Sequence, residues 1–153
     1  MKALTALLLS AAVFTAAPAF AADETAGWQD NKPQSLESLK APVRVVNLWA
    51  TWCGPCRKEM PHVKKLYEDF HSKGLEIVGV SFDESKEAWT GAIASMGLKW
   101  PQLSDLKGWQ CEAGQIYGIR SIPATLLIDK QGKIVAFGLR GAELEAKVAE
   151  LLK

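Results

Sequence analysis

The chain has 153 residues, of which 48% are hydrophobic and 23% are charged, and its formal net charge is +1. This composition fits one soluble domain whose core is large enough to fold without disulfides. A charge this close to neutral gives no reason to expect nucleic acid or an anionic membrane surface as a partner. We expect a monomer.

Residues 1–21 have the pattern of a secretory signal peptide. Lys2 precedes a short apolar run, and the small residues Ala19 and Ala21 form a cleavage site. The run falls short of the ~20 apolar residues that a membrane-spanning helix needs, and Pro18 also disfavours the alternative of an uncleaved anchor. We therefore expect cleavage after Ala21 and export to an oxidising compartment, the periplasm in a bacterium with two membranes.

The rest of the chain is predicted to be a polar, irregular arm (22–35) followed by one α/β domain (36–153). Hydrophobic periodicity and turn residues predict strands over 43–49, 75–82, 124–128 and 133–137, and helices over 55–72, 85–97, 112–117 and the last ten residues. Pro61 predicts a kink in the first helix. The segment 98–109 is expected to be a loop, and the turn 129–132 predicts a hairpin. Alternation of strands and helices favours parallel βαβ units.

Two of the three cysteines, Cys53 and Cys56, follow the first predicted strand and begin the first predicted helix. At that place unpaired backbone N–H groups and the positive end of the helix dipole stabilise a thiolate on Cys53. Pro55 falls in the first turn, where its missing N–H costs nothing. A thiolate is the nucleophile in disulfide exchange, so Cys53 is expected to attack and Cys56, one turn later, to resolve the mixed disulfide.

Two other interpretations of the pair are weaker. A structural disulfide closing so short a loop would restrict the unfolded chain little. A zinc site would need two further ligands, and the remaining candidates are Cys111, His62 and His71, with both histidines expected on solvated faces.

The segment from Trp49 to Pro61, which reads WATWCGPCRKEMP, resembles the active-site segment of exported thioredoxin-like proteins of the TlpA and ResA type. Ser121-Ile122-Pro123-Ala124-Thr125 and the segment 127–133 extend the resemblance over the chain from about Leu36 to its end. It implies a thioredoxin fold, that is, a mixed central sheet flanked by helices with an added βαβ segment. We expect no cofactor and no metal.

The resemblance also implies roles for residues around the pair. Ile122-Pro123 matches the cis peptide that lies beside the cysteines, so Pro123 would belong to the catalytic site and the Ile122 backbone would pair with an extended substrate. Trp52, Gly54 and Pro55 would contact substrate around the sulfur.

Two positions concern the proton of Cys56. Cytosolic thioredoxins have a buried Asp where this chain has Asn47, and an amide cannot take a proton. Glu84 matches a glutamate that ResA-like proteins bring close to the cysteine pair, so we expect it to relay protons for Cys56. The alternative is a solvated carboxylate at the start of a helix.

The Gly54-Pro55 dipeptide occurs in reducing thioredoxins, whereas strongly oxidising relatives carry a His beside the second cysteine. The expected activity is therefore thiol-disulfide oxidoreduction in the direction of a reductase of protein disulfides, with protein thiols and disulfides as substrates. An exported reductase also needs a membrane protein that re-reduces its cysteines. Cytochrome c maturation is a known task of the family.

Two alternative functions remain open. A thiol peroxidase would use Cys53 with Cys56 or Cys111, but peroxiredoxins have Thr three residues before the reactive cysteine and this chain has Ala50. A copper-binding thioredoxin-like module would need a wider cysteine spacing and a His near Pro123, and no His lies beyond His71.

Overall fold

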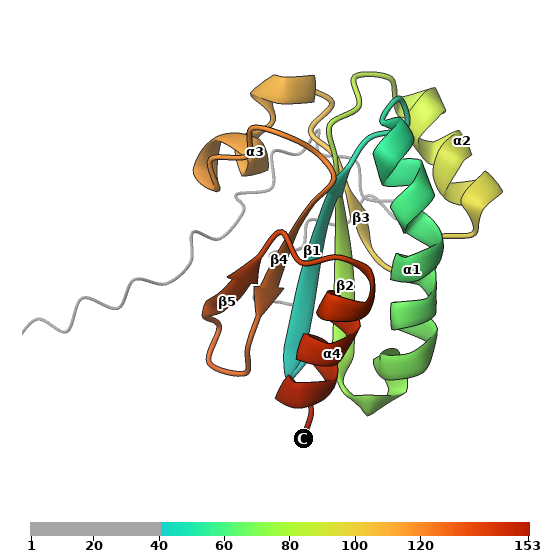
Figure 1. Ribbon diagram of the computed structural model, residues 1–153. Helices are drawn as coiled ribbons and strands as arrows, with labels where there is room; N and C mark the ends of the chain where they lie inside the picture. Colours follow the sequence, from blue (N-terminus) through green and yellow to red (C-terminus); the bar gives the residue numbers. More distant parts are fainter. Residues whose placement is uncertain (1–40) are drawn as a thin grey trace, which may run out of the picture.

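A computed structural model describes residues 41–153, so the predicted signal peptide and the whole predicted arm lie outside the described residues (Figure 1). Five strands form one sheet in the order β3-β2-β1-β4-β5. The parallel strands are β1 (Val43–Trp49), β2 (Leu75–Ser81) and β3 (Gln102–Leu103), and the antiparallel ones are β4 (Ala124–Ile128) and β5 (Ile134–Phe137). The mixed sheet and its terminal hairpin are as predicted.

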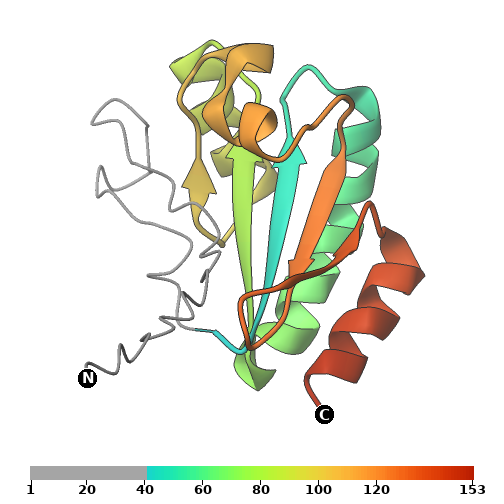
Figure 2. The ribbon, with the colours of Figure 1, turned by 90° about the vertical axis from the view of Figure 1, so that its left-hand side faces the viewer.

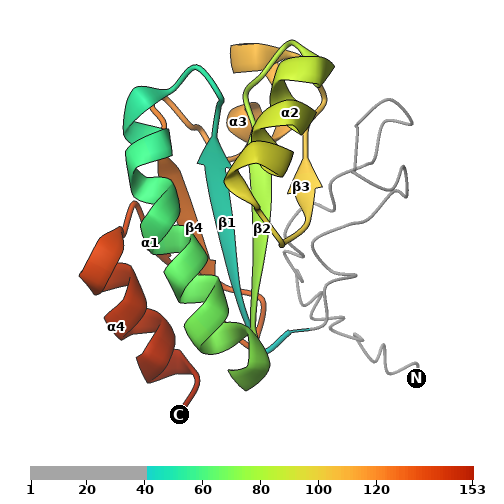
Figure 3. The same cartoon turned by 90° about the vertical axis from the view of Figure 1, so that its right-hand side faces the viewer.

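Helices cover both faces of this sheet. They are α1 (Gly54–Phe70), α2 (Lys86–Met96), α3 (Glu112–Ile116) and α4 (Gly141–Leu151), with short 3-10 turns η2 (His71–Lys73) and η3 (Gly108–Gln110). Figures 2 and 3 show α1, α2 and α4 on one face and α3 on the other. Because both faces are covered, β1 is apolar along nearly its whole length, and Val45, Val46 and Leu48 are fully buried. Within 41–153 no helix has the length and apolar character needed to span a membrane.

Local capping sets the ends of α2 where the sequence predicts them. The Ser85 side chain accepts a hydrogen bond from the backbone N–H of Ala88, and Gly97 ends the helix in the left-handed conformation. Helix α1 continues through Pro61.

The prediction of a plain loop over 98–109 is wrong. The structure places β3 and η3 in this segment, and β3 pairs with β2 at Gly79. A two-residue strand is too short to have a hydrophobic period, so only its tertiary partner reveals it. The β2-α2-β3 unit is the added parallel βαβ segment that the resemblance implies.

The buried side chain of Gln102 explains the glycine at position 79. A Cβ atom at Gly79 would lie 2.0 Å from Gln102 Oε1, and that oxygen accepts a hydrogen bond from Trp49 Nε1 at 3.1 Å. Because Gly79 has no side chain, Gln102 fits against β2 and β3 can pair there. Gln102 in turn fixes the Trp49 ring beside the carboxyl end of β1.

We expect Gly79→Ala to lower the free energy of unfolding by about 2–3 kcal/mol, because the added methyl overpacks a closed site. Gly91→Ala is the matched control, since a Cβ there meets nothing within 4 Å and α2 gains a better helix former. This control should stabilise by about 0.5–1 kcal/mol. Equal stability of the two variants in urea unfolding would show that Gln102 does not hold β3 in this way.

Candidate active site

The two cysteines lie where β1 ends and α1 begins, joined as a disulfide with a Cα–Cα distance of 5.2 Å. Cys53 is the N-cap residue of α1, and its Sγ accepts a hydrogen bond from the backbone N–H of Cys56 at 3.2 Å. Cys56 is 2% exposed and Cys53 is 5% exposed. Both residues are buried in the disulfide form, and Cys53 occupies the helix end where a thiolate is favoured.

The residues that flank Cys53 form an open rim. Gly54, Pro55 and Trp52 are exposed, and the Trp52 side chain is 56% exposed. A Cβ placed on Gly54 would meet no atom within 4 Å. The surface around Cys53 is therefore open to solvent at these three residues.

The predicted proline loop lies directly beside the disulfide. The Ile122–Pro123 bond is cis, as predicted, and the Ile122 carbonyl oxygen lies 3.6 Å from Cys53 Sγ. Arg140, which the sequence analysis did not single out, donates from Nη2 to the Pro123 carbonyl oxygen at 3.0 Å. The segment before α4 therefore helps to fix this loop against the cysteines.

Asn47 is 2% exposed and lies on β1 beneath α1, with its Nδ2 3.9 Å from Met60 Sδ. At this position the structure has an amide against a thioether, and neither group can take up the proton of Cys56. Residue 47 therefore cannot perform the proton transfer that a carboxylate performs at this position in cytosolic thioredoxins.

Glu84 lies beyond the carboxyl end of β2 with an exposed side chain. Its carboxylate rests against Gly108, where an added Cβ would come within 2.7 Å of Glu84 Oε1. No hydrogen bond or ion pair joins Glu84 to Cys53 or Cys56. The structure places it instead in a cleft on the Trp52 side of the sulfur.

Asp83 is a second residue of the site that the sequence analysis did not single out. It is 2% exposed, and its carboxylate accepts from Thr51 N at 3.1 Å, Thr51 Oγ1 at 2.5 Å and Ser81 Oγ at 2.6 Å. It thereby ties the loop that carries Trp52 and Cys53 to the end of β2. Its position just after a parallel strand, whose carboxyl end meets that of β1, was the available signal.

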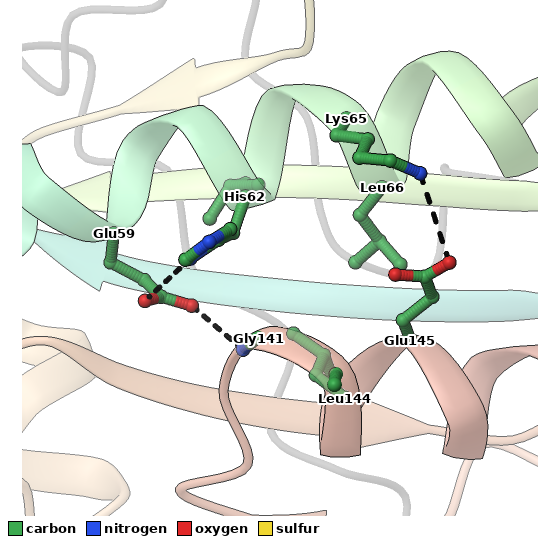
Figure 4. A pocket seen from close by; sticks show the side chains of 9 residues that line it. Glu59, His62, Lys65, Leu66, Gly141, Leu144 and Glu145 are labelled. Carbon is green, nitrogen blue, oxygen red and sulfur yellow. Dashed lines mark hydrogen bonds and ion pairs between the residues drawn. The ribbon is translucent and has the colours of Figure 1, made fainter.

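Glu59 performs a similar task on the other side of α1, three residues after Cys56. Its Oε1 accepts from the backbone N–H of Gly141 at 2.8 Å, and its Oε2 lies 3.2 Å from His62 Nδ1 (Figure 4). Figure 4 also shows Lys65 reaching Glu145 of α4 across the same groove of about 220 Å³. Glu59 therefore satisfies an N-terminal N–H group of α4 and fixes that helix to the active-site helix.

The third cysteine, Cys111, is 2% exposed and free, and its Sγ accepts from the backbone N–H of Gly114 at 3.3 Å. Burial raises the pKa of the Cys111 thiol to about 11, so the group is protonated at neutral pH. A buried, protonated thiol is a poor resolving group for a peroxidase. Within 41–153 no three His, Cys, Asp or Glu side chains are grouped to hold a metal ion.

In the oxidised protein Cys111 is the only thiol, and we expect it to resist iodoacetamide at pH 8 in the folded state and to react readily in urea. Because this pKa is raised, the free energy of unfolding changes with pH in the alkaline range. The unfolded thiol loses its proton before the folded one, so folding stability falls as the pH rises between about 9 and about 11. In urea unfolding at pH 8 and pH 11, Cys111→Ala should therefore lose less stability between the two pH values than the wild type does. Rapid reaction of the folded wild type with iodoacetamide would contradict the burial of Cys111.

Comparisons with known proteins agree with this geometry. The Redoxin family model matches residues 12–152. The chain is 34% identical over 124 residues to the thiol-disulfide oxidoreductase ResA of Bacillus thuringiensis subsp. konkukian, covering 81% of this chain and 69% of the relative. It is 37% identical over 119 residues to ResA of Bacillus subtilis, covering 78% and 63%.

Solved structures show the same relationship. The thioredoxin domain of a thiol-disulfide oxidoreductase from Bacteroides vulgatus is 34% identical with a TM-score of 0.79, covering 90% of this chain and 95% of that one. A thiol-disulfide oxidoreductase from Bacteroides fragilis is 29% identical with a TM-score of 0.78, covering 88% and 98%. With a thioredoxin fold and a Cys53–Cys56 disulfide at the start of α1, the chain belongs to the redoxin family, as a thiol-disulfide oxidoreductase of the ResA type.

Proposed function

We propose that the protein reduces disulfides of exported polypeptides in the periplasm. The observation that supports this direction is the chemistry around Cys53 Sγ, which accepts from Cys56 N while Gly54 and Pro55 bring no polar side chain to the sulfur. A strongly oxidising protein owes its potential to a highly stabilised thiolate in its reduced form. With little beyond the helix terminus to stabilise its thiolate, the reduced pair gives up electrons readily.

In the proposed reaction the Cys53 thiolate attacks one sulfur of the substrate disulfide. A bond forms between Cys53 Sγ and that sulfur, the substrate bond breaks, and the departing substrate thiolate takes a proton. Cys56 then loses its proton and attacks Cys53 Sγ, which forms the Cys53–Cys56 disulfide and releases the second substrate thiolate. Two electrons pass from the protein to the substrate.

Several site residues have proposed roles in this exchange. The Ile122 backbone, held beside Cys53 by the Pro123 loop, pairs with an extended substrate, and Trp52, Gly54 and Pro55 form the contact rim. Glu84 relays the proton of Cys56 only if its carboxylate moves from the Gly108 side of the cleft toward the second sulfur. Glu84→Gln with an unchanged dependence of the exchange rate on pH would exclude the relay.

Export is supported by the signal-peptide pattern of residues 1–21 and requires an electron source. In an oxidising compartment a reduced cysteine pair persists only if it is re-reduced. We propose a membrane protein as donor. The protein acts as a monomer in this scheme, since one chain carries both cysteines and the proline loop. Haem-attachment cysteines are one class of candidate substrates.

The experiment that tests this proposal follows the protein in the cell. A tagged full chain is expressed, the cells are quenched with acid, and free thiols are labelled with a large maleimide after fractionation. We expect a shortened chain in the periplasmic fraction with Cys53 and Cys56 reduced, and an oxidised pair when transmembrane electron supply is removed. A pair that is oxidised under both conditions would contradict the reductase assignment, and a cytoplasmic chain of full length would contradict export.

A further inference from the structure

A cleft with aromatic walls opens beside Cys53 and is not explained by disulfide exchange alone. Its volume is about 410 Å³, and Trp52, Phe82, Glu84, Gly108 and Trp109 are among its lining residues. Trp52 is the direct neighbour of Cys53 in the chain, so the cleft begins at the rim over which a substrate reaches the sulfur.

Two tryptophans form the mouth of this cleft. Trp52 is 56% exposed and Trp109 is 43% exposed, with ring centroids 6.2 Å apart and planes inclined by 49°. Trp109 also packs edge-on against Phe82 at 5.1 Å, which holds its ring in place. Exposed tryptophans at a concave surface are typical of binding sites, and the face of an indole ring attracts a cation.

The charged side chains that line the cleft are both acidic. Its lining residues include Asp83 and Glu84 and no Lys, Arg or His. The Asp83 carboxylate is buried and accepts from Thr51 and Ser81, so it is not available to a ligand. Glu84 is exposed and forms no hydrogen bond or ion pair with the described part of the chain. A carboxylate at an aromatic mouth suits a side chain with an apolar stem and a cationic end.

Gly108 and Asp83 fix this arrangement. Gly108 has a φ of +55°, which favours glycine, and an added Cβ would lie 2.7 Å from Glu84 Oε1, so a side chain there would displace the carboxylate from this position. Asp83 holds Thr51, the residue before Trp52. The two sides of the cleft are therefore set by the backbone around η3 and by the buried Asp83 network.

We propose that this cleft receives the basic side chain, Arg or Lys, of a polypeptide whose disulfide Cys53 attacks, and so selects substrates with a basic residue within about three positions of the reacting cysteine. The inference rests on the proposed function and adds a substrate class to it. The substrate backbone passes Ile122 beside Cys53 while the basic side chain lies over Trp52.

The test uses the reduced full chain and peptides in which one cysteine carries a 5-thio-2-nitrobenzoate disulfide, so that release of the chromophore reports the second-order rate constant of the attack by Cys53. Three peptides differ only at the second residue from this cysteine, which is Arg, citrulline or Glu. Citrulline has nearly the shape of Arg without its charge. We expect the rate constant with the Arg peptide to exceed that with the citrulline peptide by about tenfold, and the rate constant with the Glu peptide to be the lowest.

Matched variants test whether Glu84 and Trp109 cause the preference for the Arg peptide. Glu84→Gln should bring the ratio of Arg to citrulline below about twofold, whereas Glu87→Gln, which neutralises an exposed carboxylate of α2 outside the lining residues, should keep it near tenfold. Trp109→Leu should lower the rate with the Arg peptide more than with the Glu peptide.

The outcomes separate the two proposals. Bis(2-hydroxyethyl) disulfide has no basic group and needs only the cysteine pair, so failure to reduce it would contradict the proposed function. Reduction of this compound with equal rates for the Arg and citrulline peptides would overturn the cleft assignment alone. A Glu84→Gln variant that reacts more slowly with all three peptides by the same factor would also overturn the cleft assignment. That result would indicate that Glu84 relays a proton and does not select basic substrates.

Discussion

Cys53→Ser is expected to abolish reduction of insulin disulfides, with a loss on the order of 10³-fold or more, because a serine hydroxyl cannot replace the thiolate that attacks the substrate sulfur. Cys53 is the N-cap of α1 and lies beside the Ile122 carbonyl and the exposed rim, so no other group of the site is placed to take its role. The measurement is the rate of insulin precipitation with dithiothreitol as the electron source.

Cys56→Ser should behave differently, and the difference distinguishes the attacking cysteine from the resolving one. The variant keeps the attacking thiolate but cannot resolve, so it should accumulate a mixed disulfide with substrate that survives non-reducing electrophoresis. Cys111→Ser is the matched control and should retain most of the wild-type rate, since Cys111 is buried and its pKa is raised. A stable mixed disulfide in Cys53→Ser and none in Cys56→Ser would reverse the two roles.

Asp83→Ala is expected to lower the free energy of unfolding by about 2–3 kcal/mol, because the buried Ser81 hydroxyl and the partly buried N–H and hydroxyl of Thr51 would lose their acceptor. The melting temperature should fall on the order of 10 °C. The loop that carries Trp52 and Cys53 also loses its attachment to β2, so kcat/KM should fall by at least about tenfold even below the melting temperature.

Asp83→Asn keeps the shape of the side chain and one acceptor oxygen, and we expect a loss of about 1–2 kcal/mol. Glu68→Ala removes a carboxylate from the exposed face of α1 and should stay within about 0.5 kcal/mol of wild type. Urea unfolding of the three variants measures these differences. An Asp83→Ala protein as stable as Glu68→Ala would mean that the buried network does not hold the active-site loop.

The parts of the fold that local chemistry decides could be predicted from the sequence. Ser85 and Gly97 bound α2 because a hydroxyl cap and a left-handed glycine act within one helical turn. The place of Cys53 at the start of α1 follows in the same way from a β-branched run that ends at Trp49, with four residues between it and the Gly54-Pro55 helix start.

Other features depend on contacts between distant segments. The sequence alone favoured Glu84 over Asp83 as the acidic residue of the site, although the two are neighbours, because burial at the end of β2 is set by Thr51 and Ser81 and leaves no local pattern. Trp109 lies in a segment without hydrophobic periodicity, and only the packing of η3 against Phe82 brings it to Trp52. The cysteine pair was therefore predictable and the cleft beside it was not.

The reduction potential of the Cys53–Cys56 couple tests the central claim most directly. The purified protein is equilibrated in glutathione and dithiothreitol buffers of graded potential, and the oxidised fraction is read by thiol labelling, with Cys111→Ser used so that only the pair reacts. A reductase should titrate close to the value of thioredoxin, about −270 mV. A midpoint close to that of the oxidant DsbA, about −120 mV, would contradict the account and make the protein a donor of disulfides.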